Sequence, residues 1–147
     1  ILAAAGMKRL GIENRITKVI SHEIILPAIG QGAIGIETRV QDGYIKDLLK
    51  PINHKESFIC VNAERTFLKK LGGSCQVPIA AYARLKDNNK IIMDALVSNI
   101  SGNKIIKVSK EFFQEEAETM AIALANEILQ KGAKQILQDL YNSNYER

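Results

Sequence analysis

The chain has 147 residues, of which 46% are hydrophobic and 24% are charged, which suits one compact core or a small domain together with parts of another. Its 20 lysine and arginine residues against 16 aspartate and glutamate residues give a formal net charge of +4, and only 5% of the residues are aromatic. This composition excludes a strongly basic, base-stacking surface, so we expect no nucleic acid among the partners. No apolar run approaches the roughly 18 residues of a membrane-spanning helix, so we expect no membrane partner either. Two cysteines and no apolar signal segment ahead of them predict a reduced, cytoplasmic chain.

The chain opens with ILAAAGMKRLGIENRI, which has the pattern of a helix already under way, without an N-cap ahead of it. Gly11 is expected to end this helix, because glycine is common just past a helix C-terminus. The pattern predicts that the chain is a fragment of a longer protein.

Residues 23–40, EIILPAIGQGAIGIETRV, are largely apolar and are interrupted by Pro27 and three glycines. They predict two strand-like pieces joined by a glycine-rich crossing. Residues 30–35 match the dinucleotide-binding pattern G-x-G-x-x-G, but the third glycine leads into an alternating, strand-like stretch where that motif requires a helix. We therefore predict that this match does not bind a nucleotide.

A self-contained pattern begins after Pro51. Asn53 and Glu56 are spaced as a capping box, in which Asn53 accepts from the backbone and Glu56 reaches back. This predicts a helix over residues 54–71 that ends at a C-cap glycine, Gly72 or Gly73, with positive φ.

Three apolar or alternating stretches follow, separated by polar turns, at residues 77–85, 91–98 and 104–110. They predict a three-stranded antiparallel meander. From Ala117 onward apolar residues recur at helical spacing, which predicts one or two helices that cover a single face of the sheet. The fold class is therefore α+β, with a C-terminal three-stranded antiparallel sheet covered by helices.

The two cysteines have different surroundings. Cys60 lies in an apolar row at near-helical spacing and is expected to be part of the core. Cys75 follows two glycines in LGGSCQVPIA, where the helix gives way to a strand, and a thiol in such a turn can be structural or reactive. His22 and His54, a loop residue and a solvated first-turn residue, have no metal-ligand spacing to either cysteine, so no metal site is predicted.

The carboxylates Glu13, Glu37 and Glu64 are isolated in the sequence, and we expect each to be a surface or ion-pair group. Residue patterns alone therefore predict a soluble α+β module with a cysteine in a turn, and they indicate no more specific function. A non-enzymatic anion-binding module and a thiol redox protein stay open as alternatives, although the redox alternative lacks a C-x-x-C pair.

Three longer sequence segments allow a more specific interpretation. LAAAGMKRLG, LPAIGQGAIGIE and AERTFLKKLGGSCQVPIAAYA, in this order, resemble the porphobilinogen deaminase (hydroxymethylbilane synthase) family over essentially the whole chain. The resemblance implies a transferase of haem biosynthesis that polymerises four porphobilinogen units, with loss of ammonia, into hydroxymethylbilane. It also implies that porphobilinogen and the growing pyrrole chain are the ligands.

The resemblance assigns roles to individual residues. Cys75 matches the cysteine that forms a thioether to a dipyrromethane cofactor, which primes chain growth. Arg9 matches an arginine that binds the cofactor carboxylates, Gln31 matches a residue lining the cofactor cleft, and Gly73 adjoins the attachment point. The catalytic aspartate of the family has no counterpart in this chain, so no catalytic residue is assigned.

The resemblance also divides the chain. Residues 1–26 would close a second domain, residues 27–52 would be the crossing and a return segment of a first domain, and residues 53–147 would form the third, cofactor-attachment domain. The first two would be α/β domains like those of periplasmic binding proteins. The chain would then be the C-terminal part of the enzyme, inactive alone, with the N-terminal part as its partner and a monomer as the complete form.

Overall fold

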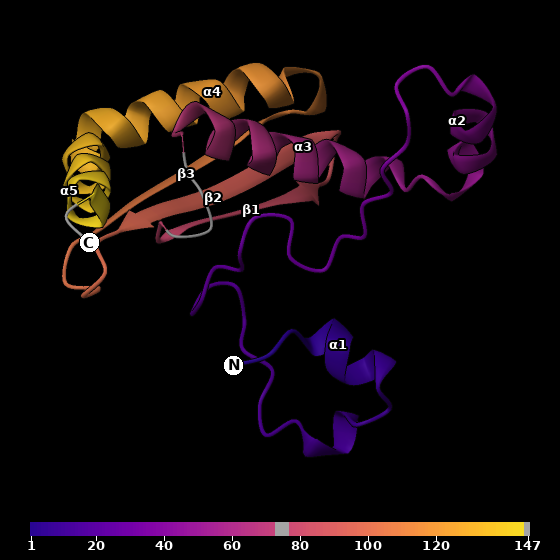
Figure 1. Cartoon of the computed structure of the whole chain (residues 1–147), viewed down its shortest axis with the longest axis horizontal. Coiled ribbons are helices and arrows are strands. Elements are labelled where there is room, and N and C mark those ends of the chain that lie inside the picture. The colour runs from indigo at the N-terminus through magenta and orange to yellow at the C-terminus, as the bar shows by residue number, and fades with distance from the viewer. Residues whose placement is uncertain (73–76, 146–147) are drawn as a thin grey trace.

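The computed structural model describes residues 1–72 and 77–145, with side chains described up to Asn142 (Figure 1). In chain order the elements are α1 (Ala4–Arg9), the 3-10 turn η1 (Glu13–Arg15), α2 (Gly43–Leu49), η2 (Lys50–Ile52), α3 (Lys55–Lys70), β1 (Ile79–Lys86), β2 (Lys90–Ser98), β3 (Ile105–Phe113), η3 (Gln114–Glu116), α4 (Ala117–Ile128), the π-helical turn η4 (Leu129–Ala133) and α5 (Lys134–Tyr145).

The three strands form the predicted antiparallel meander in the order β1-β2-β3. The β1–β2 turn is possible because Asn88 and Asn89 both take φ of 61°, a conformation that asparagine tolerates better than most residues. The strands begin and end within a few residues of the predicted stretches, which is the usual precision at element ends.

One face of the sheet carries the core, as predicted. Figure 1 shows α3 and α4 side by side over this face, with α5 across one end, and α3 packs on β1 while α4 packs on β3. Apolar residues recur along each helix at the spacing of one face, so burying that face against the sheet removes them from water together. The largest fully buried side chains are Phe67, Ile91, Met93, Val97, Leu124 and Ile128.

The predicted cap of α3 is wrong by one residue. His54 is the N-cap, and its Nδ1 atom accepts a hydrogen bond from the backbone N–H of Ser57 at 3.3 Å. Asn53 instead ends the preceding turn η2, where its own N–H donates to the carbonyl of Lys50. Because Asn53 belongs to that turn, the helix starts one residue later than the capping-box spacing indicated.

The predicted C-terminus of α3 is confirmed. Leu71 is the C-cap and Gly72 takes φ of 65°, so glycine is needed there to leave the helix. Gly73, the other glycine considered for this role, lies outside the described residues.

Ahead of α3 the chain differs from the sequence prediction. The helix that ends near Gly11 is present as α1, but no strand is assigned within residues 23–40. A strand is defined by its hydrogen-bonded neighbour, and in the described part of the chain no strand pairs with this segment. No residue before Cys60 is buried, and apolar side chains such as Ile34 stay exposed.

Candidate functional site

A groove of about 340 Å³ lies between three parts of the chain: the crossing, the first turns of α3, and β1. The crossing, residues 27–32, follows Leu26 and contains two turns with glycine at positive φ, at Gly30 and Gly32. The groove is lined by Pro27, Ala28, Gly30, Gln31, Gly32, Ala33, His54, Glu56, Ser57, Cys60, Val61, Glu64, Tyr82, Ala83, Arg84 and Leu85.

Glu64 links the walls of this groove. Its side chain is only 4% exposed, and its two carboxylate oxygens accept from the backbone N–H groups of Gly30 at 2.7 Å and Ala83 at 2.8 Å. Burial raises the pKa of this carboxyl above its ordinary value, although both backbone hydrogen bonds oppose the rise. Among the described residues no lysine or arginine forms an ion pair with it, so backbone dipoles replace its lost water.

The expectation that Glu64 is a surface or ion-pair group is therefore wrong. The sequence did contain a signal, because Cys60, Ala63 and Phe67 mark the buried face of α3 and Glu64 lies on the same face. A carboxylate among core positions of an amphipathic helix indicates a buried group that needs hydrogen-bond donors.

Cys60 is part of the core, as predicted, and is 8% exposed. Burial raises the pKa of its thiol, and the negative charges of Glu64 and Glu56 raise it further. A thiol held in its protonated form is a poor nucleophile, so Cys60 is a poor resolving partner for a redox cysteine.

A polar cluster occupies the sheet face opposite the helices, beside the groove. The Asp94 carboxylate accepts hydrogen bonds from Arg84 and from the hydroxyl of Ser109. Burial alone would raise the pKa of Asp94, but these hydrogen bonds and the Arg84 charge hold it below its ordinary value. His22, a loop residue as predicted, lies with its ring centroid 5.1 Å from that of Tyr82. This contact brings the segment ahead of the crossing against β1.

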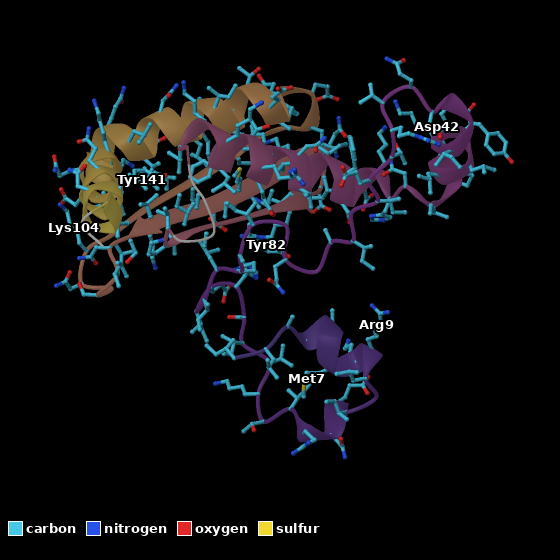
Figure 2. All side chains as sticks on the ribbon, in the orientation of Figure 1. Met7, Arg9, Asp42, Tyr82, Lys104 and Tyr141 are labelled. Atoms are coloured by element: carbon cyan, nitrogen blue, oxygen red, sulfur yellow. The ribbon has the colours of Figure 1, made fainter. Side chains whose placement is uncertain are left out.

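The structure separates the sequence-predicted site residues. Gln31 is exposed and lines the groove, with its N–H donating to the carbonyl of Ala28. Arg9 is exposed on the last turn of α1 and is not among the groove residues; Figure 2 shows it on α1, away from Tyr82. Cys75 and Gly73 lie outside the described residues.

The residues that flank Cys75 are described. Gly72 lies past the end of α3, whereas the groove lies along the first half of this helix. The hydroxyl of Tyr141 in α5 donates to the carbonyl of Gly72 at 2.6 Å, and Val77 is buried in the core. Both flanks are therefore fixed to the packed body of the C-terminal domain.

The described residues form neither a metal-ligand cluster nor a membrane-spanning helix. Within residues 1–72 and 77–145, no three His, Cys, Asp or Glu side chains gather as a metal-ligand set. None of the described helices has the length and apolar character needed to cross a bilayer.

Comparison with known proteins identifies the family. A family model described as porphobilinogen deaminase, dipyromethane cofactor binding domain, matches residues 1–47, and a second, porphobilinogen deaminase, C-terminal domain, matches residues 58–130. The porphobilinogen deaminase of Carboxydothermus hydrogenoformans is 47% identical over 140 residues, which cover 95% of this chain and 45% of the relative. The chain thus spans less than half the length of that relative. These matches support neither the anion-binding module nor the redox protein. The resemblance seen in the sequence is confirmed, and the chain belongs to the porphobilinogen deaminase family.

Proposed function

We propose that the chain is the C-terminal part of an enzyme that polymerises four porphobilinogen units, with loss of ammonia, into hydroxymethylbilane. The observation that carries this proposal is that two models of one family match consecutive parts of the same chain, the second of them the C-terminal domain. The substrate would be porphobilinogen together with the growing pyrrole chain. A cytoplasmic location fits this role.

Cys75 is the proposed attachment point of dipyrromethane. When bound, this cofactor supplies the free pyrrole position to which the first porphobilinogen unit is joined. The described flanks suit an anionic ligand, because Lys69 and Lys70 are exposed in the last turn of α3 next to Gly72. Gly73 would leave room beside the attachment point.

Arg9 and Gln31 are the proposed contacts to cofactor or substrate carboxylates. Both side chains are exposed, so both can still meet a ligand. They come from separate parts of the chain, and a ligand between them would need the remainder of the enzyme to complete its pocket. The catalytic acid of the family would belong to that remainder.

The remainder of the enzyme is the proposed partner. Residues 1–26 and 27–52 would complete two α/β domains of the periplasmic-binding-protein type, while residues 53–147 would form the third domain. The apolar side chains left exposed ahead of α3 support this, because an apolar surface of this extent favours burial against another part of a protein. The exposed apolar side chains of this region include Leu2, Leu10, Val19, Ile24, Ile34, Ile36, Val40 and Leu48. The complete enzyme would be a monomer.

Peptide mapping tests the proposal. The chain would be fused to the part of the Carboxydothermus relative that it does not match, and the protein would be analysed by intact mass and by peptide mapping. We expect a dipyrromethane adduct on the peptide that contains Cys75 and deaminase activity that Cys75→Ser abolishes. The 147-residue chain alone should have free thiols and no activity.

Cys60→Ser is the matched control, because it removes the other thiol and should keep both adduct and activity. An adduct on Cys60, or full activity in the Cys75→Ser fusion, would overturn the assignment of Cys75. A fusion that folds but forms no hydroxymethylbilane would count against the proposed reaction itself.

A further inference from the structure

We infer that Glu64 is a positioning residue that fixes the crossing, and Gln31 with it, against the C-terminal domain. The inference rests on the proposed function only for the role of Gln31 toward a ligand; the attachment of the crossing by Glu64 stands on geometry alone. Glu64 accepts hydrogen bonds from the N–H groups of Gly30 in the crossing and Ala83 on β1, and both residues line the groove.

The two amides have no equivalent partner in regular secondary structure. Ala83 lies on β1, which within residues 1–72 and 77–145 is an edge strand paired only with β2. Its N–H is bound by Glu64, so this edge donor is satisfied by a side chain. Gly30 lies in the crossing, where the backbone hydrogen bonds from Gln31 to Ala28 and from Ala33 to Gly30 are local turns. The bond to Glu64 is therefore the hydrogen bond that joins the crossing to α3.

A carboxyl group suits this arrangement. Each of the two oxygens of Glu64 can accept from one N–H, and a carboxyl group keeps this acceptor capacity when it is protonated, whereas the amide of glutamine has one oxygen and one NH₂ group. In Glu64→Gln one backbone donor would face another donor in a buried place, which leaves a hydrogen bond unmade. The crossing would then lose its fixed point on α3.

The position of the attachment is one residue from Gln31. Gly30 takes φ of 70°, and a Cβ atom there would be in ordinary van der Waals contact, at 3.8 Å, with the side chain of Val61 on α3. The crossing therefore passes within contact distance of the helix at this point. Releasing Gly30 would displace Gln31 first, while the core beneath β2 and α4 makes no use of the Glu64 carboxylate.

Amide hydrogen exchange on the 147-residue chain tests the attachment. Wild type and Glu64→Gln would be compared residue by residue with NMR. We expect exchange at Gly30 to become faster by about tenfold or more, with a smaller change at Ala83 and none at Ile91 and Met93 in β2. Glu56→Gln is the matched control, because Glu56 lines the same groove from the same helix but is exposed.

Unchanged exchange at Gly30 would overturn the inference, and so would an equal acceleration at all amides, which is the result of a general loss of stability. If Glu64→Gln does not fold, Glu64→Asp takes its place, since its shorter side chain keeps the charge but cannot reach both amides. In that variant, protection retained at both Gly30 and Ala83 would overturn the inference.

The complete enzyme supplies a second readout. In the fusion described above, Glu64→Gln should lower kcat per adduct-bearing molecule by about tenfold, while the fraction that carries the adduct stays as in the parent. A purely structural role would lower the folded fraction and leave kcat per loaded molecule unchanged. If the parent fusion has no deaminase activity, the proposed function fails, and hydrogen exchange still decides the role of Glu64.

Discussion

The carboxyl groups of Glu64 and Glu111 respond oppositely to their surroundings. Burial raises the pKa of Glu64, whereas hydrogen bonds from Lys86 at 2.6 Å and Lys90 at 2.8 Å lower the pKa of Glu111 to about 2. The cost of dehydration decides the first case, and nearby cations in water decide the second. The pH dependence of folding should therefore contain two opposed contributions.

For Glu64 the folded pKa lies above the unfolded value of 4.5, so its protonated form is favoured by folding. The contribution of Glu64 to the free energy of unfolding is fully present below pH 4.5, and it is lost as the pH rises through the folded pKa. The melting temperature of wild type minus that of Glu64→Gln should thus be largest in acid and fall as pH rises toward neutrality. Glu56→Gln, which removes an exposed carboxylate from the same groove, is the matched control for the loss of one negative charge. A difference that grows with pH would contradict this prediction.

For Glu111 the contribution to stability changes with pH in the opposite direction. Its folded pKa of about 2 lies below the ordinary 4.5, so its stabilising contribution is present above 4.5 and is lost as pH falls through about 2. Glu111→Gln should therefore flatten the acid side of the stability curve, and added salt should shrink the difference from wild type, since the three side chains are partly exposed. Acid titrations of the melting temperature at two salt concentrations check both points, and an acid limb with unchanged slope would rule the contribution out.

At the scale of the element, the two ends of α3 have different surroundings. Its first turns line the groove, and its last turn leads into Gly72, which holds φ of 65°. One helix thus connects the wall of the groove to the flank of Cys75. Changes at either end can be separated by variants that leave the core untouched.

Gly72→Ala should destabilise the chain by about 1 kcal/mol, because an L side chain is strained at this positive φ. Gly6→Ala is the matched control, since Gly6 lies inside the exposed helix α1, where an added methyl group meets open space and alanine is the better helix former. Urea or thermal unfolding measures both variants. Equal stability of Gly72→Ala and wild type would show that the helix end does not depend on glycine.

At the scale of the whole molecule, the packed domain and the segments ahead of it differ in how they bury apolar surface. Every buried residue belongs to the part from Cys60 onward, and the exposed α1 and α2 segments extend from it (Figure 1). Substitutions ahead of α3 should therefore affect ligand binding in the complete enzyme more than the stability of this chain.

Arg9→Leu applies this to the proposed function. In the complete enzyme it should weaken chain elongation by roughly 2 to 5 kcal/mol, the cost of removing one partner of a desolvated charge pair. The melting temperature should not change, because Arg9 is exposed on α1. Lys8→Leu, beside it on the same helix, should leave kcat/KM near that of the parent. Equal kcat/KM for Arg9→Leu and the parent would remove Arg9 from the proposed site.

The meander and its helices could be predicted because each depends on a local pattern: alternation in β1 and β2, and a 3.6-residue period in α4. The strand expected near Ile36 is absent from the described part of the chain, because a strand requires a hydrogen-bonded neighbouring strand as well as an alternating sequence. Sequence periodicity alone does not show whether such a neighbour exists. Glu64 is buried against the expectation from its residue type, because it lies on the buried face of α3 and receives two backbone hydrogen bonds there. Gln31 lines the groove, but sequence spacing does not reveal that its neighbour Gly30 bonds to a residue of α3 that lies 34 positions away.

The hydrogen bond from Tyr141 to Gly72 also bears on when the chain completes its fold. The two residues are 69 positions apart, and Tyr141 lies on α5. During synthesis, Gly72 leaves the ribosome well before Tyr141, at a stage when the donor to its carbonyl does not yet exist. The carbonyl that follows α3 therefore gains this hydrogen bond only after α5 has been made, so the end of α3 reaches its final state late in synthesis.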